Sequence, residues 1–272
     1  MQNRLWWAAT SLLVCVTFAP SSDAQEAPRP PSDGASPPRI FTAPTPSERP
    51  VSWKQLVPNI LQDQKPIWLF PVRVAEGKHL KPTAGLLLAT AGLVALDPHT
   101  APYFRRTDSF MGFNRDFSGE RTAIGTTLVP LSFYAFSLAR KDSYGQRTAL
   151  LAGEAVADAE ILTTVMKNVD RRLRPSDIPP NGDFSHTWFK THGRLLSGRG
   201  SFPSGHTIAA FSVATVFADR YRKHRWVPYV AYGLAGFVGF TRVPLQAHFV
   251  SDVFAGAALG YVVAHNVTLR QP

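Results

Sequence analysis

The sequence has almost no cysteine. Its single cysteine, Cys15, lies in an apolar segment near the N-terminus that we expect to be removed from the mature protein. The mature chain then has no disulfide, no thiol nucleophile and no cysteine ligand for a metal ion. Any catalytic nucleophile must therefore be another side chain.

Acidic residues are also few. Asp and Glu number 19 against 29 Lys and Arg, which gives a formal net charge of +10. Such a balance suits nucleic acid, anionic lipid or phosphorylated substrates. No nucleic-acid motif and no long basic run accompanies it, so we expect no nucleic-acid partner and favour an anionic substrate.

The chain has too little hydrophobicity to be mostly embedded in a membrane. Its mean hydropathy is −0.07 and its apolar fraction is 44%, which is ordinary for a globular protein. A length of 272 residues allows one good-sized domain with appendages. No internal repeat is evident.

The first 50 residues read as targeting and linker segments. Arg4, the apolar run 5–18 and the small residues before a cleavage site after Ala24 predict a signal peptide over 1–24. An uncleaved membrane anchor is the alternative. Residues 25–50 are rich in proline, serine and alanine and predict a disordered linker. We therefore expect export to the periplasm and a folded domain over 51–272.

The rest of the chain predicts helices. An amphipathic helix of low regularity follows Ser52, and six longer apolar segments have helical length. Pro98, Gly145 and Pro228 separate them, and Pro130 falls inside one. The six segments lie near 82–97, 120–140, 146–169, 204–222, 227–241 and 249–266.

Whether these helices cross a bilayer is left open by their composition. The runs 122–139, 227–241 and 253–264 approach the required length. The helix over 146–169 carries three carboxylates, which would be costly in lipid. A soluble or membrane-associated periplasmic domain is the expectation, and an integral inner-membrane protein is the alternative.

A Pro-Ser-Gly-His tetrapeptide, 203–206, marks the start of one helix. Ser204 is a good N-cap, because its hydroxyl can accept an unpaired backbone N–H. Gly205 lets a ligand approach the backbone, and a helix N-terminus attracts anions. His206 adds a group that can carry a proton near neutral pH.

Two further blocks flank the tetrapeptide. Upstream, Lys167 is followed after six residues by Arg174-Pro175; downstream, Arg242 is followed after five residues by His248 and after three more by Asp252. The three blocks together resemble the signature of the type 2 phosphatidic acid phosphatase and vanadium haloperoxidase superfamily. The one departure is Thr241 in place of the usual serine, which keeps a hydroxyl.

These residue types suit phosphoryl transfer, which needs cations on the non-bridging oxygens, an in-line nucleophile and an acid for the leaving group. The cations are Lys167, Arg174 and Arg242, and Ser204 and Gly205 can add neutral donors. Since His248 and Asp252 are four residues apart, we expect them on one helix face, with the carboxylate fixing the imidazole. Five other basic residues are interpreted as solvated surface charges: Arg171, Arg172, Arg220, Arg222 and Lys223.

The resemblance implies roles for both histidines. It makes His248 the nucleophile that forms a phosphohistidine, and His206 the acid that protonates the leaving group. It also implies that no metal ion or other cofactor is required, and that vanadate acts as an inhibitor. The expected fold is all-α, a compact bundle of about six helices with the active site at one end.

Three functions remain open. The leading one is a metal-independent phosphatase acting outside the cytoplasm on a lipid phosphate or a soluble phosphoester. A vanadium-dependent haloperoxidase is a second, because vanadate mimics the phosphoryl transition state in the same site. The third is a non-catalytic phosphate-binding envelope protein. The motifs are compatible with a lipid or a soluble phosphorylated substrate and with any oligomeric state.

The connection 176–200 joins the first two blocks and is expected to form part of the site's rim. Asp183, Trp188, Phe189 and Lys190 are weak candidates for contacts with the leaving group. His186 and His192 are expected to be exposed rather than metal ligands.

Overall fold

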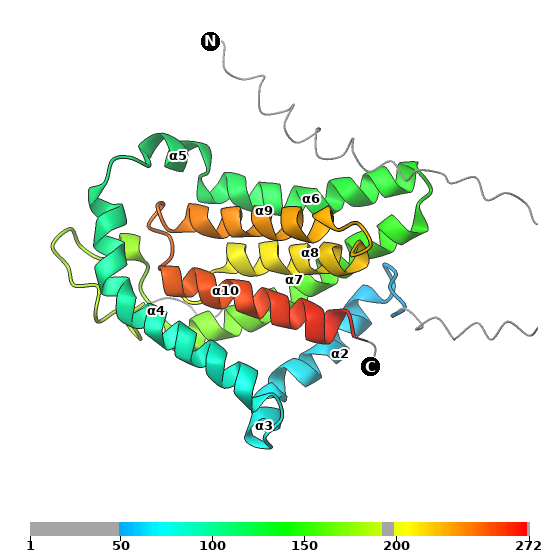
Figure 1. Cartoon of the computed structure of the whole chain (residues 1–272), viewed down its shortest axis with the longest axis horizontal. Helices are drawn as coiled ribbons and strands as arrows, with labels where there is room; N and C mark the ends of the chain where they lie inside the picture. Colours follow the sequence, from blue (N-terminus) through cyan, green and yellow to red (C-terminus); the bar gives the residue numbers. More distant parts are fainter. Residues whose placement is uncertain (1–48, 192–198, 271–272) are drawn as a thin grey trace, which may run out of the picture. The chain divides into compact units, whose positions relative to one another are not determined.

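The computed structural model describes residues 49–191 and 199–270, and its regular elements there are all helical (Figure 1). The predicted signal peptide, nearly all of the predicted linker and His192 lie outside these residues. The α-helices are α2 (Leu56–Trp68), α3 (Phe70–Ala75), α4 (Leu80–Arg106), α5 (Met111–Asp116), α6 (Gly119–Ala139), α7 (Ser143–Asp170), α8 (Gly205–Arg220), α9 (Trp226–Arg242) and α10 (Val250–Val263). A 3-10 turn, η1 (Pro175–Asp177), and a π-turn, η2 (Ala264–Thr268), complete them.

The all-α prediction is confirmed, but six helices were too few. All six longer predicted segments are helical, the amphipathic helix expected after Ser52 is α2, and α3 and α5 add to them. Pro58 does not prevent α2, because it lies in the first turn, where its missing N–H has no helical partner. The two shortest helices, α3 and α5, have six residues each and too little periodicity to be recognised.

The largest error in helix length concerns α4. Pro98 was expected to end this helix at residue 97, yet the helix continues through Pro98 and Pro102 to Arg106. A proline removes one backbone hydrogen bond and bends a helix, but it does not always end it. The added turns make α4 27 residues long and carry its C-terminal end to the η1 turn, where Arg105 donates to the carbonyl of Pro179.

At the centre of the fold, α8 packs against α7, α9 and α10. Small residues permit the closest of these contacts. A β-carbon on Gly260 would lie 2.5 Å from the carbonyl oxygen of Ile208, and one on Gly256 would lie 2.8 Å from that of Ser204. The backbones of α8 and α10 therefore approach each other along the whole seam that leads to Ser204.

We predict that Gly260→Ala destabilises the fold by about 1–3 kcal/mol, because the new methyl group overpacks this seam. Gly236→Ala is the matched control, since no atom lies within 4 Å of the position that its β-carbon would take. The control should keep or raise the melting temperature, because alanine favours a helix. Thermal unfolding followed by circular dichroism in detergent compares them, and equal melting of both variants would refute the close seam.

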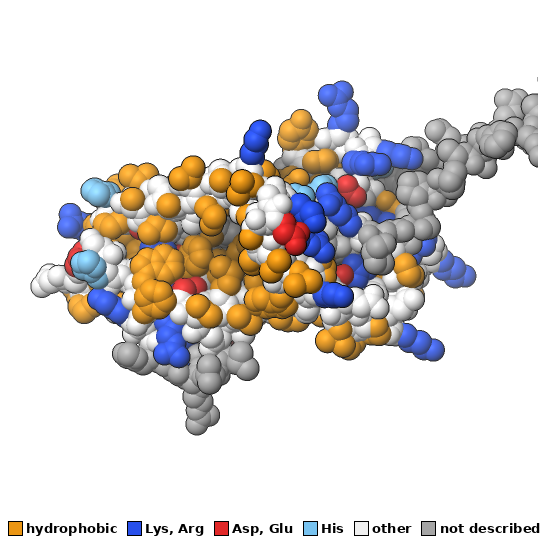
Figure 2. Space-filling view, turned by 90° about the horizontal axis from the view of Figure 1, so that it is seen from below, with side chains coloured by type: hydrophobic (Ala, Val, Ile, Leu, Met, Phe, Trp, Pro, Cys, Tyr) orange, Lys and Arg blue, Asp and Glu red, His pale blue; other side chains and the backbone are white. Residues whose placement is uncertain are grey.

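Three helical segments are long and apolar enough to cross a membrane: α4, α6, and α10 continued into η2. Only 6% of the most apolar window of α4 is buried, and the same holds for α6. Leu87 and Leu88, for example, are 63% and 74% exposed. Hydrophobic side chains cover much of the face seen in Figure 2. A surface of this kind is typical of contact with lipid.

The two ends of the described domain meet at one arginine. Arg49 lies within the predicted linker, yet its guanidinium pairs with Asp63 of α2 at 2.8 Å and with Glu154 of α7 at 3.3 Å. It also donates to the carbonyl of Thr268 in η2. Thr268 in turn donates to Asp158 at 3.2 Å. The packed part of the chain therefore begins before residue 51, and these contacts offset the burial of carboxylates on α7.

Candidate active site

The first sequence block leaves the end of α7. Lys167 is in the last turn, and Arg171 closes the helix in the left-handed conformation, with φ 45°. The chain then runs through Arg172 to Arg174. The Nε of Arg174 is buried and has no hydrogen-bond partner among the described residues, so this cation is available to an anion.

Backbone hydrogen bonds connect the Pro-Ser-Gly-His block and its preceding residues to both of the other motif blocks. The N–H of Ser201 donates to the carbonyl of Arg172 at 2.8 Å, and that of Ser204 donates to the carbonyl of Asp252 at 3.0 Å. A β-carbon on Gly205 would lie 3.5 Å from Lys167 Nζ. The ammonium group therefore sits at the N-terminus of α8, where the helix dipole also favours an anion.

Ser204 occupies the predicted N-cap position, but its hydroxyl does not cap the helix. It accepts no backbone N–H and instead accepts a hydrogen bond from Thr207 Oγ1 at 2.8 Å. The expected cap was wrong in this detail, because a hydroxyl one turn along the helix competes for the same oxygen. The backbone N–H groups of the first turn are thereby left for a ligand.

His206 faces the start of α6. Its Nε2 lies 3.0 Å from the carbonyl oxygen of Gly119, so this nitrogen carries the proton. Burial is the main cause that lowers the pKa of His206 to about 4; Arg242, His248 and Lys167 act in the same direction, and the Gly119 contact opposes them. The imidazole is therefore neutral at pH 7 when no anion is bound.

Arg242 ends α9 and is buried. One of its terminal nitrogens, Nη2, donates to the carbonyl of Phe117 at 2.9 Å and to Thr122 at 2.6 Å. Its Nε donates to the hydroxyl of Thr241 at 2.9 Å, so the threonine that stands in place of the usual serine still supplies a hydroxyl acceptor. Nη1 has no partner among the described residues. Two arginines, Arg174 and Arg242, thus each retain a buried unpaired donor.

His248 precedes α10 and is 3% exposed. Its Nδ1 lies 2.7 Å from the carbonyl oxygen of Ser201, which fixes the tautomer with the proton on Nδ1. Burial lowers the pKa of His248, with help from Lys167 and Arg174 and against the pull of Asp252. The other nitrogen, Nε2, is therefore left with a free electron pair.

The expected hydrogen bond between Asp252 and His248 is not formed. Asp252 Oδ2 lies 3.6 Å from Nδ1, an ion-pair distance that is too long for a hydrogen bond. The two residues do not share a helix face either, because α10 begins only after Phe249. Asp252 instead accepts from the Ser201 hydroxyl at 2.5 Å and from the N–H of Phe249 at 2.8 Å.

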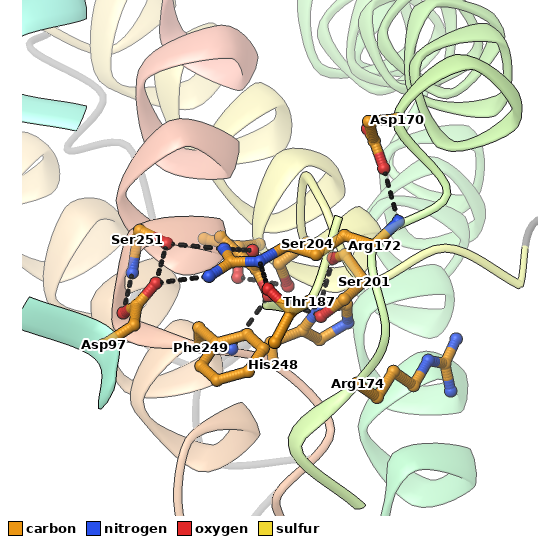
Figure 3. Close-up of polar contacts among 12 residues, drawn as sticks. Asp97, Asp170, Arg172, Arg174, Thr187, Ser201, Ser204, His248, Phe249 and Ser251 are labelled. Carbon is orange, nitrogen blue, oxygen red and sulfur yellow. Dashed lines mark hydrogen bonds and ion pairs between the residues drawn. The ribbon is translucent and has the colours of Figure 1, made fainter. Parts of the chain in front are cut away.

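The interpretation of Arg172 as a solvated charge was wrong. Its side chain is 1% exposed and lies at the centre of a polar network, with Asp97 and Ser251 on one side and Ser201 and His248 on the other (Figure 3). Arg174 lies apart from this network in the same view. Arg220 is also partly buried, over the ring of Tyr144, whereas Arg171, Arg222 and Lys223 are exposed as expected.

The sequence contained signals for two of the missed residues. Arg172 lies between two motif cations, and Asp97 is the one carboxylate in an otherwise apolar helix, where a charge requires a partner. Nothing comparable marked Ser201 or Ser251. On the rim, Asp183, His186, Phe189 and Lys190 are exposed and Trp188 is half-buried.

Comparison with known proteins matches residues 148–271 to the model of the PAP2 superfamily. Lipid A 4'-phosphatase of Porphyromonas gingivalis is 26% identical over 156 residues, which are 57% of this chain and 64% of the relative. Lipid A 1-phosphatase of the same organism is 42% identical over 64 residues, which are 23% of this chain and 14% of the relative. The chain thus spans less than two thirds of the length of these curated relatives.

A transmembrane PAP2 type phosphatidylglycerolphosphate phosphatase from Bacillus subtilis is a structural neighbour, with a TM-score of 0.44 and 21% identity. The match covers 68% of this chain and 92% of that one. The three motif blocks all fall within the region that matches the family model. Residues 148–271, less than half of the chain, are therefore similar to the PAP2 superfamily.

Proposed function

We propose that this chain is a phosphoric ester hydrolase that removes phosphate from a membrane lipid through a phosphohistidine intermediate. One observation carries the proposal. Two buried arginine donors, on Arg174 and Arg242, have no partner among residues 49–191 and 199–270, and they lie beside two neutral histidines and the N-terminus of α8. Buried unpaired donors are costly unless a ligand satisfies them, and guanidinium groups bind phosphate through paired, charge-assisted hydrogen bonds.

In the proposed reaction, Nε2 of His248 attacks phosphorus and the bond to the lipid oxygen breaks. His206, protonated when the phosphate is bound, gives a proton to the departing oxygen. Water then gives a proton to His206 and attacks phosphorus, the phosphorus–nitrogen bond breaks with its electron pair returning to His248, and phosphate leaves. A bound phosphate dianion would offset the cations that lower the pKa of His206 and so raise that pKa toward a value useful for an acid.

A lipid substrate agrees with the surface of the domain. The apolar helices α4 and α6 are mostly exposed, and a shallow hollow on the surface of α7 is lined by Ile161, Val165, Thr164 and Glu160. Glu160 also lies beside Gly205, because a β-carbon there would be 3.3 Å from its carboxylate. The hollow would give an acyl chain a place next to the phosphate site. We further propose that α4, α6 and α10 with η2 span the bilayer.

The named relatives act on two different phosphates of lipid A, so we propose a phosphorylated glycolipid as the substrate class without choosing its position. Export beyond the cytoplasm rests on residues 1–24 and stays a prediction. Independence of metal also stays a prediction, although no group of His, Cys, Asp or Glu in residues 49–191 or 199–270 is arranged to hold a metal ion.

The test is phosphate release by the purified full chain in detergent micelles with excess EDTA. Lipid A, phosphatidic acid and p-nitrophenyl phosphate are compared as substrates. We expect release to persist in EDTA, to be inhibited by orthovanadate and to be fastest with a lipid. The proposal fails if a folded preparation releases phosphate from none of the three.

A further inference from the structure

The guanidinium group of Arg172 donates to four side chains and packs on two aromatic rings. Nη1 donates to Asp252 Oδ1 at 2.5 Å and to Ser251 at 2.8 Å, Nη2 donates to Asp97 at 2.6 Å, and Nε donates to Thr187 at 3.2 Å. The guanidinium also stacks on Phe249, 4.1 Å from the ring centroid, and on Trp188 at 4.5 Å. The hydrogen bonds therefore fix the guanidinium group within its plane, and the ring contacts fix it perpendicular to that plane.

Asp97 supplies the second half of this arrangement from α4. It is fully buried, although the surrounding helix is mostly exposed. Besides Arg172, it accepts from the N–H of Ser251 at 3.3 Å and from the Ser251 hydroxyl. Its helix lies outside the region that matches the family model. The burial of a lone carboxylate on an apolar helix requires a compensating partner, which here is Arg172.

The network ends at the proposed nucleophile. Asp252 is held by Arg172 on one oxygen and by Ser201 and the Phe249 N–H on the other. Ser201 also holds His248, through its carbonyl oxygen. Arg172 thus reaches His248 through Asp252 and Ser201, without touching it.

We infer that Asp97 and Arg172 are positioning residues, which fix Asp252 and Ser201 and thereby the orientation of His248. The inference rests on the proposed function for its effect on turnover. Its structural content is that α4, a helix outside the matched family region, sets the geometry and the electrostatic surroundings of the imidazole.

Charges make the inference testable without turnover. Besides this network, the charged or titratable groups that act on His248 are Lys167 of α7, Arg174 of the following loop and His206 of α8. Asp170, at the end of α7, acts on Asp252 and Arg172. None of these residues is changed in the variants. Arg172→Gln leaves Asp252 less neutralised, so the imidazolium is favoured and the pKa of His248 should rise. Asp97→Asn lets Arg172 neutralise Asp252 more fully, so the pKa of His248 should fall.

The experiment uses the full chain labelled with ¹⁵N-histidine in detergent, with the His248 signal assigned by its loss in His248→Asn. Its pH titration is compared in wild type, Arg172→Gln, Arg172→Lys and Asp97→Asn. Two exposed neighbours provide matched controls, Arg171→Lys and Asp108→Asn. Steady-state kinetics are measured on the same samples, and folding is checked by circular dichroism.

We expect His248 to titrate at higher pH in Arg172→Gln, at lower pH in Asp97→Asn, and unchanged in the controls. We also expect kcat to fall about ten- to hundredfold in Arg172→Lys and Asp97→Asn with KM within about twofold, because small displacements of a nucleophile are costly. If Arg172→Gln does not fold, the kcat of Arg172→Lys and the titration and kcat of Asp97→Asn test the inference.

A merely structural role would lower the melting temperature without opposite shifts in the titration, and that result would overturn the inference. So would unchanged titration and kcat in folded variants. If wild type releases no phosphate while the opposite shifts are seen, the proposed reaction fails and the coupling of α4 to His248 stands.

Discussion

Replacing His248 should abolish phosphate release, with a loss of at least about a thousandfold in kcat, because the ring nitrogen proposed to attack phosphorus is then missing. Two replacements separate chemistry from folding. His248→Ala removes the ring together with its bond to Ser201. His248→Asn keeps an N–H that can donate to the Ser201 carbonyl, but has nothing in place of Nε2.

Both variants should be inactive, and His248→Asn should keep a melting temperature close to that of wild type. The control is His186→Ala, which changes an exposed histidine of the rim and should leave activity unchanged. Trapping adds a second measurement: acid-labile label from a ³²P-labelled substrate should appear on wild type and be absent from both variants. Turnover by His248→Asn at more than a few per cent of the wild-type rate would rule out His248 as the nucleophile.

Replacing His206 should have an effect that depends on the leaving group. His206→Ala should lower the rate with a lipid phosphate by about a hundred- to ten-thousandfold, because an alkoxide leaves poorly without a proton. The first step with p-nitrophenyl phosphate should be nearly unaffected, since nitrophenolate leaves unprotonated. The same residue is proposed to activate water, so the second step should slow with both substrates.

For His206→Ala, we expect the time course to show a burst of nitrophenol equal to the amount of enzyme, followed by slow release of phosphate. Rapid mixing with p-nitrophenyl phosphate measures the burst, and the labelled phosphoenzyme should accumulate beyond its level in wild type. His206→Gln is the companion variant, because its amide can still donate to the Gly119 carbonyl. Equal losses with both substrates and no burst would remove His206 from acid catalysis.

The sequence predicted the helical fold and the location of the motif residues because both depend on local patterns. Apolar runs of helical length gave the six long helices, and spacing brought Lys167, Arg174, His206, Arg242 and His248 into one proposed site. The extent of α4 was not predictable in this way. Pro98 is a helix breaker by local rules, and the tertiary contacts on either side of it, of Asp97 with Ser251 and of Arg105 with Pro179, are not visible in the local sequence.

The errors within the site have a common physical origin. Ser204, Arg172 and Asp252 each have several possible partners, and the sequence does not say which partner wins. The hydroxyl of Thr207 replaced a backbone N–H at Ser204, the carbonyl of Ser201 replaced Asp252 as the acceptor from His248, and buried acids replaced water around Arg172. Competition of this kind is decided by tertiary geometry rather than by residue type.

The meeting of Arg49 and Thr268 has a consequence for biosynthesis. Asp158 is translated 110 residues before Thr268, which donates to its carboxylate in the finished fold. Until η2 leaves the ribosome, the Asp158 carboxylate of α7 lacks the hydrogen bond from Thr268. An isolated α7, which carries several carboxylates, would be costly to release into lipid. The carboxylate of Asp158 therefore gains this hydrogen bond only after η2 has been translated, so a chain that stalls before η2 should be a preferred substrate for membrane quality-control proteases.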